Sequence, residues 1–165
     1  TGRYIAMRFL VKPMDFPNAF MYGAGHGGVE AMLLCGVASI SNIASAVMIN
    51  SGTMSAQLAT LDAEKAADTA AALSALWTTP SLTFFAGGVE RIIAVVLHLS
   101  LSILVFQSIR KKSQKDLLNA YLFHFVIDSL SVLLSAVASV WVVELVAALL
   151  TGGAVLMAKY ACMEE

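Results

Sequence analysis

The sequence predicts an all-α protein, a polytopic bundle of about four transmembrane helices plus an extramembrane helix. Hydrophobic residues make up 59% of the 165 residues, charged residues make up 13%, and the mean hydropathy is +0.81. Soluble domains average about 45–50% apolar and about 25% charged residues. A helix needs about 20 apolar residues to cross a bilayer, and several stretches of this chain reach that length. Composition and segment length therefore predict an integral membrane protein.

The first membrane segment is predicted over residues 19–50, after a basic and apolar lead-in at residues 1–18. We expect the lead-in to lie at the membrane surface. Pro13 and Pro17 would end it, and Asn18 would cap the helix that follows. The segment is longer than one crossing requires, so it tilts or contains a break. Small residues near its start allow close packing against a neighbouring helix, and they are Gly23, Gly25, Gly27 and Gly28.

Two contrasting connections separate the remaining segments. Residues 51–80 are acidic and alanine-rich and contain Trp77 near their end, which predicts an extracytoplasmic loop or helix. The run QSIRKKSQKD at residues 107–116 is strongly basic, so it should be cytoplasmic. Further membrane segments are predicted at residues 81–106, 117–136 and 138–158. Four crossings then put both termini of the chain in the cytoplasm.

Ionisable residues recur inside three of the apolar segments, and they are the main clue to function. Residues four apart share a helix face, which pairs His26 with Glu30 and His124 with Asp128. With His98, these residues are predicted to lie at one depth of the membrane. An ionisable group at the centre of a span costs on the order of 2.5–3.5 kcal/mol, and such groups usually mark a functional site. The alternative is a structural network that only orients the helices.

Three further charged residues in the apolar segments have less certain roles. Arg91 lies two helical turns before His98 and shares its face. It belongs either to the site or to a structural ion pair with Glu90 or Glu30. Glu144 is the single charge of the last segment, and we predict a structural or lipid-interface role for it.

A carboxylate among several histidines suits hydrolysis. Glu30 could activate a water molecule as a general base. A histidine oriented by Asp128 could donate to the developing oxyanion. The same side chains are ordinary ligands of Zn²⁺, and the candidate ligands are His26, Glu30, His98 and His124. The local order is HGGVE rather than the HExxH of many zinc peptidases, so the cofactor prediction stays open between none and Zn.

Three stretches together resemble the YhfC-type bacterial membrane proteins: GAGHGGVEAMLL, GGVERIIAVVLHLSLSILV and HFVID, within residues 19–136. That family is regarded as related to the CAAX-prenyl endopeptidase and bacteriocin-processing clan of intramembrane proteases. The clan pattern is EExxxR, then FxxxH, then HxxxN or HxxxD. The resemblance implies that Glu30 is the activating glutamate and His98 the second-motif histidine. It also implies that His124 and Asp128 form the third motif.

The sequence departs from the clan pattern at several positions. Ala31 stands where a second glutamate is expected, no arginine follows at the clan spacing, and Ala94 replaces the aromatic residue of FxxxH. His26 and the pair Glu90 and Arg91 are additional to the pattern, and we include them among the catalytic candidates. The resemblance implies a glutamate-dependent protease, although the family also carries a metalloprotease label.

The resemblance further implies a multi-pass protein of the bacterial cell membrane that acts on a membrane protein or peptide. Family members usually have more spans, and the chain starts at Thr1 rather than at a methionine. We therefore expect a single membrane domain over residues 1–165 that is a fragment without N-terminal spans. The net charge of −1 gives no reason to expect a nucleic-acid partner. The sequence indicates no oligomeric state.

Two other classes of function remain open from the sequence. A transporter or channel could use the same cluster to carry protons or a divalent cation. No inverted repeat is visible in the sequence, which makes this hypothesis the weaker one. A non-catalytic scaffold could instead use the pocket to bind a partner helix.

Overall fold

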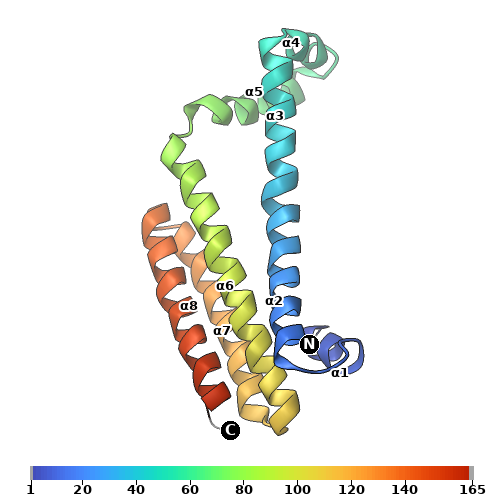
Figure 1. The fold of residues 1–165 in the computed structure, drawn as a ribbon. Coiled ribbons are helices and arrows are strands. Elements are labelled where there is room, and N and C mark those ends of the chain that lie inside the picture. The colour runs from blue at the N-terminus through green and yellow to red at the C-terminus, as the bar shows by residue number, and fades with distance from the viewer. Residues whose placement is uncertain (1, 164–165) are drawn as a thin grey trace. The chain divides into compact units, whose positions relative to one another are not determined.

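The computed structural model describes residues 2–163, and the regular elements in that range are all helical (Figure 1). In chain order they are α1 (Gly2–Phe9), α2 (Phe16–Ala31), the π-helix η1 (Met32–Gly36), α3 (Val37–Asn50), α4 (Thr53–Leu58), α5 (Ala63–Thr78), α6 (Ser81–Lys111), α7 (Gln114–Ser135) and α8 (Val140–Met163). Within the described range, four stretches are long and apolar enough to cross a membrane: Phe16–Asn50, Ser81–Lys111, Gln114–Ser135 and Val140–Met163. The predicted all-α, four-span architecture is confirmed.

Local capping explains where several helices begin. Ser113 caps α7, because its hydroxyl accepts a hydrogen bond from the backbone N–H of Asp116 at 3.3 Å. Asp15, rather than the predicted Asn18, caps α2 by accepting from the backbone N–H of Asn18 at 2.9 Å. Asp62 caps α5 in the same way, which divides the predicted single helix of residues 51–80 into α4 and α5.

The chain forms two compact units. The bundle unit consists of the residues up to Ala31 together with those from Ala86 onward, and the second unit is Met32–Phe85. Every site residue predicted from the sequence belongs to the bundle unit. The site can therefore be described within one unit.

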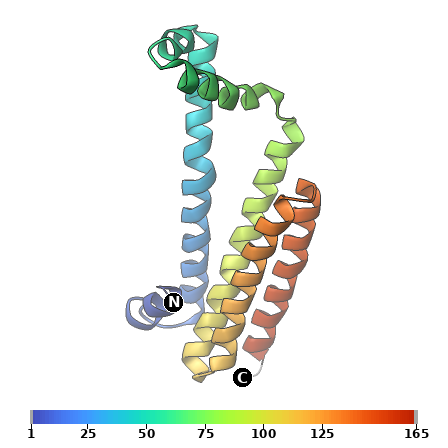
Figure 2. The ribbon, with the colours of Figure 1, turned by 180° about the vertical axis from the view of Figure 1, so that it is seen from behind.

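Helix α6 is the centre of the bundle unit. In the most apolar stretch of α6, 56% of the residues are buried. The corresponding share is 11% in α7 and 22% in α8. Figures 1 and 2 show α6, α7 and α8 running side by side. Helices α7 and α8 expose large apolar side chains such as Leu133 and Leu149, as expected where a helix meets lipid. Several polar side chains in the second half of α6, such as His98 and Ser102, are thus buried inside the bundle unit.

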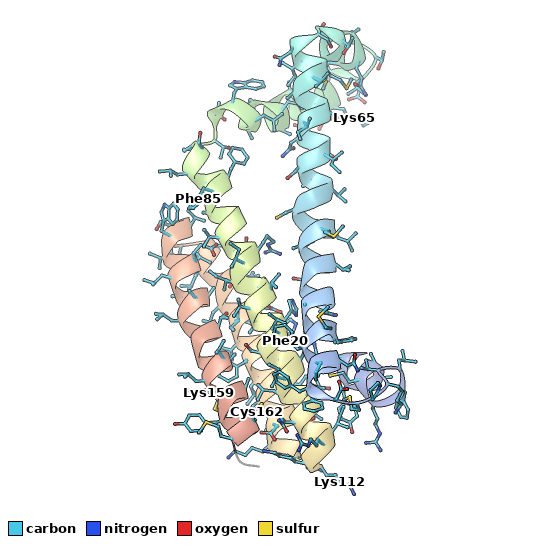
Figure 3. The ribbon with its side chains drawn as sticks, in the orientation of Figure 1. Phe20, Lys65, Phe85, Lys112, Lys159 and Cys162 are labelled. Carbon is cyan, nitrogen blue, oxygen red and sulfur yellow. The ribbon has the colours of Figure 1, made fainter. Side chains whose placement is uncertain are left out.

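The last turns of α6 and α8 are tied together at one end of the bundle unit. The side-chain amide of Gln107 donates to the sulfur of Cys162 at 3.3 Å. The ammonium group of Lys111 donates to the carbonyl oxygen of Ala161. Figure 3 shows Lys112 and Cys162 at this same end.

Small residues bring α2 close to α6. Ala19, Gly23 and Gly27 recur every four residues and are buried. A Cβ atom at Gly23 would lie 2.9 Å from the Cα of Leu99, and one at Gly27 would lie 3.1 Å from the Cβ of His98. Small residues at such spacing let two helix backbones approach closely in a bilayer. The contact sets the His26–Glu30 face of α2 beside α6.

The lead-in helix α1 packs onto the bundle unit rather than lying wholly at a surface. Met7 is 0% exposed and belongs to the apolar core, with Tyr4 and Val11 packed against it. Arg3 precedes Met7 by four residues and therefore shares its face. The inward face of α1 consequently carries a cation as well as apolar side chains.

Within the second unit, helices α3, α4 and α5 contact one another. Gly52, between α3 and α4, has a φ of +78°, a left-handed conformation that side chains disfavour. A cavity of about 240 Å³ lies between these helices, with Met54, Leu73 and Trp77 among its lining residues.

We predict that Gly23→Ala destabilises the protein while Gly25→Ala does not. The added methyl at position 23 meets backbone atoms of α6, and overpacking of this kind costs about 1–3 kcal/mol. Position 25 has nothing within 4 Å, and alanine favours a helix over glycine by up to about 1 kcal/mol. Thermal unfolding of the detergent-solubilised protein, followed by tryptophan fluorescence, measures both. Equal melting temperatures for the two variants would contradict the close α2–α6 contact.

Candidate active site

Five of the predicted residues come together from three helices of the bundle unit. Helix α2 supplies His26 and Glu30, α6 supplies His98, and α7 supplies His124 and Asp128. The i, i+4 spacing within α2 and within α7 gives each helix one polar face. The contact between Gly27 and His98 then brings the α2 face against α6.

Glu30 and His98 form the central contact of the site. The Nε2 atom of His98 lies 3.0 Å from Oε2 of Glu30. His98 is only 3% exposed, whereas the Glu30 side chain is 38% exposed. The other carboxylate oxygen of Glu30 lies 3.9 Å from Nη1 of Arg91. Glu30 is therefore held from one side and still open to an incoming molecule.

Arg3 contacts the opposite nitrogen of the same imidazole. Its Nη2 atom lies 2.6 Å from Nδ1 of His98. Burial lowers the pKa of the Arg3 guanidinium, and the charges of Tyr22 and Glu30 act in the opposite direction. A guanidinium offers donors only, so Nδ1 must accept this hydrogen bond. The ring proton of His98 is then on Nε2, which donates to Glu30.

His26 completes a compact group with Glu30 and His98. The ring centroids of His26 and His98 are 4.9 Å apart. Tyr22 stacks on His26, with centroids 6.0 Å apart and planes 23° apart. One potential ligand atom from each of His26, Glu30 and His98 lies within 4.8 Å of the others. These three side chains can therefore act on one bound atom.

His124 is oriented by a carboxylate. Its Nδ1 atom lies 2.7 Å from Oδ2 of Asp128, one helical turn further along α7. Its ring approaches His98 edge to face, with centroids 5.6 Å apart and planes at 80°. Because an ionised carboxylate only accepts, the proton of neutral His124 lies on Nδ1 and leaves Nε2 as the acceptor.

Two cavities meet at this cluster. The first, of about 430 Å³, has Arg3, His26, Tyr121, His124 and Phe125 among its lining residues. The second, of about 350 Å³, has most of the ionisable residues of the cluster in its lining: Glu30, Glu90, Arg91, His98, His124 and Asp128. His124 lines both. Cavities of about 300–1,000 Å³ are of the size that binds small ligands.

The remaining charged residues extend the polar network along α6 towards α8. Arg91 bonds to Glu90, its neighbour in the chain. Glu144 of α8 is 7% exposed and interacts with the charges of Glu90 and Arg91. The lipid-interface alternative for Glu144 is therefore wrong, because its side chain faces the interior of the bundle unit.

The structure adds Arg3 and Glu144 to the predicted set. In the sequence, Arg3 is one of three basic residues of the lead-in at residues 1–18. Its spacing of four residues from Met7, which is buried in the structure, was the only sign that it faces inward. Glu144 carried a stronger hint, because a lone charge in a span usually faces the protein interior.

The donor set is compatible with a zinc ion. Two histidines and one glutamate are a known ligand set of catalytic zinc, and the spacing of His26, Glu30 and His98 allows all three to reach one ion. His124 is not part of this close group within residues 2–163. Arg3 complicates the fit, because it occupies Nδ1 of His98 as a donor.

Comparison with known proteins places the chain in a family. Residues 1–147 match the model of a family described as YhfC intramembrane metalloprotease. The chain is 39% identical over 124 residues to the uncharacterized membrane protein YhfC of Bacillus subtilis (strain 168). The match covers 74% of this chain and 47% of that protein, so the chain spans about half the length of the curated relative. No solved structure matches the chain. The chain belongs to the YhfC intramembrane metalloprotease family.

Proposed function

We propose that this chain carries the catalytic residues of an intramembrane endopeptidase that hydrolyses a peptide bond with a water molecule activated by Glu30. The observation that carries the proposal is the placement of Glu30. His98 holds one of its oxygens, and the carboxylate lines the cavity of about 350 Å³ that His124 and Asp128 also line. The family description supports a protease, and the kinship with the CAAX-prenyl endopeptidase clan stays a prediction from the motifs.

Glu30 is the general base of this mechanism. A water molecule in the cavity lined by Glu30 would give a proton to the Glu30 carboxylate as the water oxygen attacks the carbonyl carbon of the scissile peptide bond. Positioned proton transfer of this kind accelerates a reaction by about 10²–10⁴-fold. When the C–N bond breaks, the proton held by Glu30 passes to the departing amine. The OH of the water ends on the carboxylic acid product and its proton ends on the amine product. One water molecule is consumed, and Glu30 returns to its ionised form.

His98 and His124 would polarise the scissile carbonyl. The Nε2–H of His98 holds Glu30 before the reaction and can donate to the carbonyl oxygen once Glu30 is protonated. For His124 to act as a donor, its Nε2 would first take up a proton from solvent through the cavity. Asp128 at Nδ1 stabilises the resulting imidazolium, whose Nε2–H would donate a hydrogen bond to the oxyanion.

The other members of the cluster would support these groups. His26 lies against His98 and assists Glu30 from the side of the larger cavity. Arg91, between Glu30 and Glu90, balances two negative charges in a medium of low dielectric constant. If a zinc ion binds, His26, Glu30 and His98 would hold it, and it would supply Lewis acidity and an activated water.

The proposed substrate is a membrane protein or peptide, because the cavities belong to a membrane-spanning bundle. The proposed location is the bacterial cell membrane, with the basic run of residues 107–116 and both termini of the chain in the cytoplasm. Because the chain matches about half of its curated relative, the activity of the whole protein is part of the proposal.

We predict that Glu30→Gln lowers peptide hydrolysis by at least about 10²-fold, because glutamine keeps the shape but cannot accept the proton of water. The assay uses a set of labelled transmembrane peptides reconstituted with the protein in liposomes, with products identified by mass spectrometry. The matched control is Glu64→Gln on α5, which should cleave at the unaltered rate.

Unchanged cleavage by the Glu30→Gln protein would overturn the proposed role of Glu30. A different pair of results would favour the transport hypothesis instead. The unaltered protein would cut no peptide but would carry protons or Zn²⁺ across the liposome membrane, and the Glu30→Gln protein would lose that flux.

We predict that Asp128→Asn lowers the rate by about 10–100-fold, the usual effect of losing a group that orients a functional histidine. His124→Ala should lower it at least as much. The double variant should be no slower than His124→Ala alone, because the carboxylate acts only through the imidazole. Rates of the two single variants and the double variant test this directly, and additive losses would show that Asp128 acts by another route.

A further inference from the structure

Arg3 is a cation that reaches the buried imidazole of the site from outside the four spans. It lies on α1, 95 residues before His98 in the chain, and its guanidinium donates to Nδ1 of His98 at 2.6 Å. Helix α1 is anchored by Met7, which is completely buried in the apolar core. The contact is therefore held by packing and does not depend on Arg3 alone.

The consequence for His98 is a single tautomer. A guanidinium cannot accept a hydrogen bond, so Nδ1 of His98 stays unprotonated while Arg3 is in place. The proton is on Nε2, where it donates to Glu30 across 3.0 Å. Both ring nitrogens of His98 are thus in use, and Glu30 receives a donor whose direction is fixed.

This arrangement is the reverse of the one that a metal ligand needs. A histidine that binds a metal through one nitrogen usually carries N–H on the other and donates it to an acceptor. In this site the partner of Nδ1 is itself a donor. A divalent cation at Nε2 of His98 would either move the single ring proton to Nδ1, where it would face the N–H of Arg3, or require an imidazolate ring that has lost that proton. Arg3 and Arg91 also place two positive charges beside the same ligand group.

We propose that Arg3 is a positioning residue that locks His98 in the Nε2–H tautomer and thereby favours the metal-free form of the His26–Glu30–His98 group. The part of this inference that concerns catalysis rests on the proposed peptidase function. The tautomer and the metal affinity do not, because both are properties of the protein without substrate.

The first test is nitrogen NMR of the detergent-solubilised protein labelled with ¹⁵N-histidine. The chain has only three histidines, so His26→Gln and His124→Gln variants assign the three ring signals. We expect His98 to show the pattern of a protonated Nε2 and an unprotonated Nδ1. A His98 signal with the proton on Nδ1 in the unaltered protein would overturn the proposal, and this result needs no Arg3 variant to fold.

The second test is Zn²⁺ affinity, measured by competition with a chromophoric chelator after removal of bound metal. Arg3→Met removes the donor and its charge while keeping an apolar stem, and we expect it to bind Zn²⁺ about 10- to 100-fold more tightly. Arg3→Lys keeps a cationic donor and should stay close to the unaltered protein. The matched control is Arg8→Met, because Arg8 lies on the same helix but is exposed and donates to the Tyr4 hydroxyl.

Equal or weaker Zn²⁺ binding by Arg3→Met, with a melting temperature close to that of the unaltered protein, would refute the proposed role of Arg3. A peptidase assay distinguishes this failure from failure of the proposed function. Glu30→Gln lowers cleavage by at least about 10²-fold if the proposed function is right, whatever the Zn²⁺ affinity of the Arg3 variants.

Discussion

The close approach of α2 to α6 is the contact on which the candidate site depends. Gly23 and Gly27 leave no room for a side chain between the two backbones. Because Gly27 packs directly against His98, the next turn of α2 brings Glu30 within hydrogen-bonding distance of that imidazole. A bilayer provides little hydrophobic force to hold two helices together, so this closeness comes from packing and from the polar contacts beside it.

Those polar contacts offset the cost of placing charge in a membrane. Glu30, His98 and Arg3 each satisfy another member of the group, and Arg91 is shared between Glu30 and Glu90. The free-energy cost of moving an ionisable group out of water is lower when the group has such partners than when it is isolated. The network therefore lowers the free-energy cost of burying these charges in the bundle unit, and it also fixes the geometry of the site.

The two histidines nearest the reaction cavity are oriented in opposite senses. A donor, Arg3, holds Nδ1 of His98, whereas an acceptor, Asp128, holds Nδ1 of His124. One ring therefore presents N–H and the other presents a lone pair towards its surroundings. A pair of this kind suits a reaction in which protons must be given and taken within a few ångströms. It also gives the two residues different relations to a metal, since Asp128 supports ligation by His124 and Arg3 opposes ligation by His98.

The length and composition of the apolar stretches were enough to predict the membrane helices, and a spacing of four residues was enough to predict the pairing of His26 with Glu30 and of His124 with Asp128. Each pairing concerns residues on one helix, where the backbone itself determines which side chains share a face. Burial of Glu144 was only suggested by its place as a lone charge in a span, and the contact between Arg3 and His98 could not be reached from the sequence. They depend on which helix faces meet, and that is decided by packing between segments far apart in the chain. The tertiary structure therefore determined the tautomer of His98, because its partner lies 95 residues away and only the folding of α1 onto the bundle unit brings the two together.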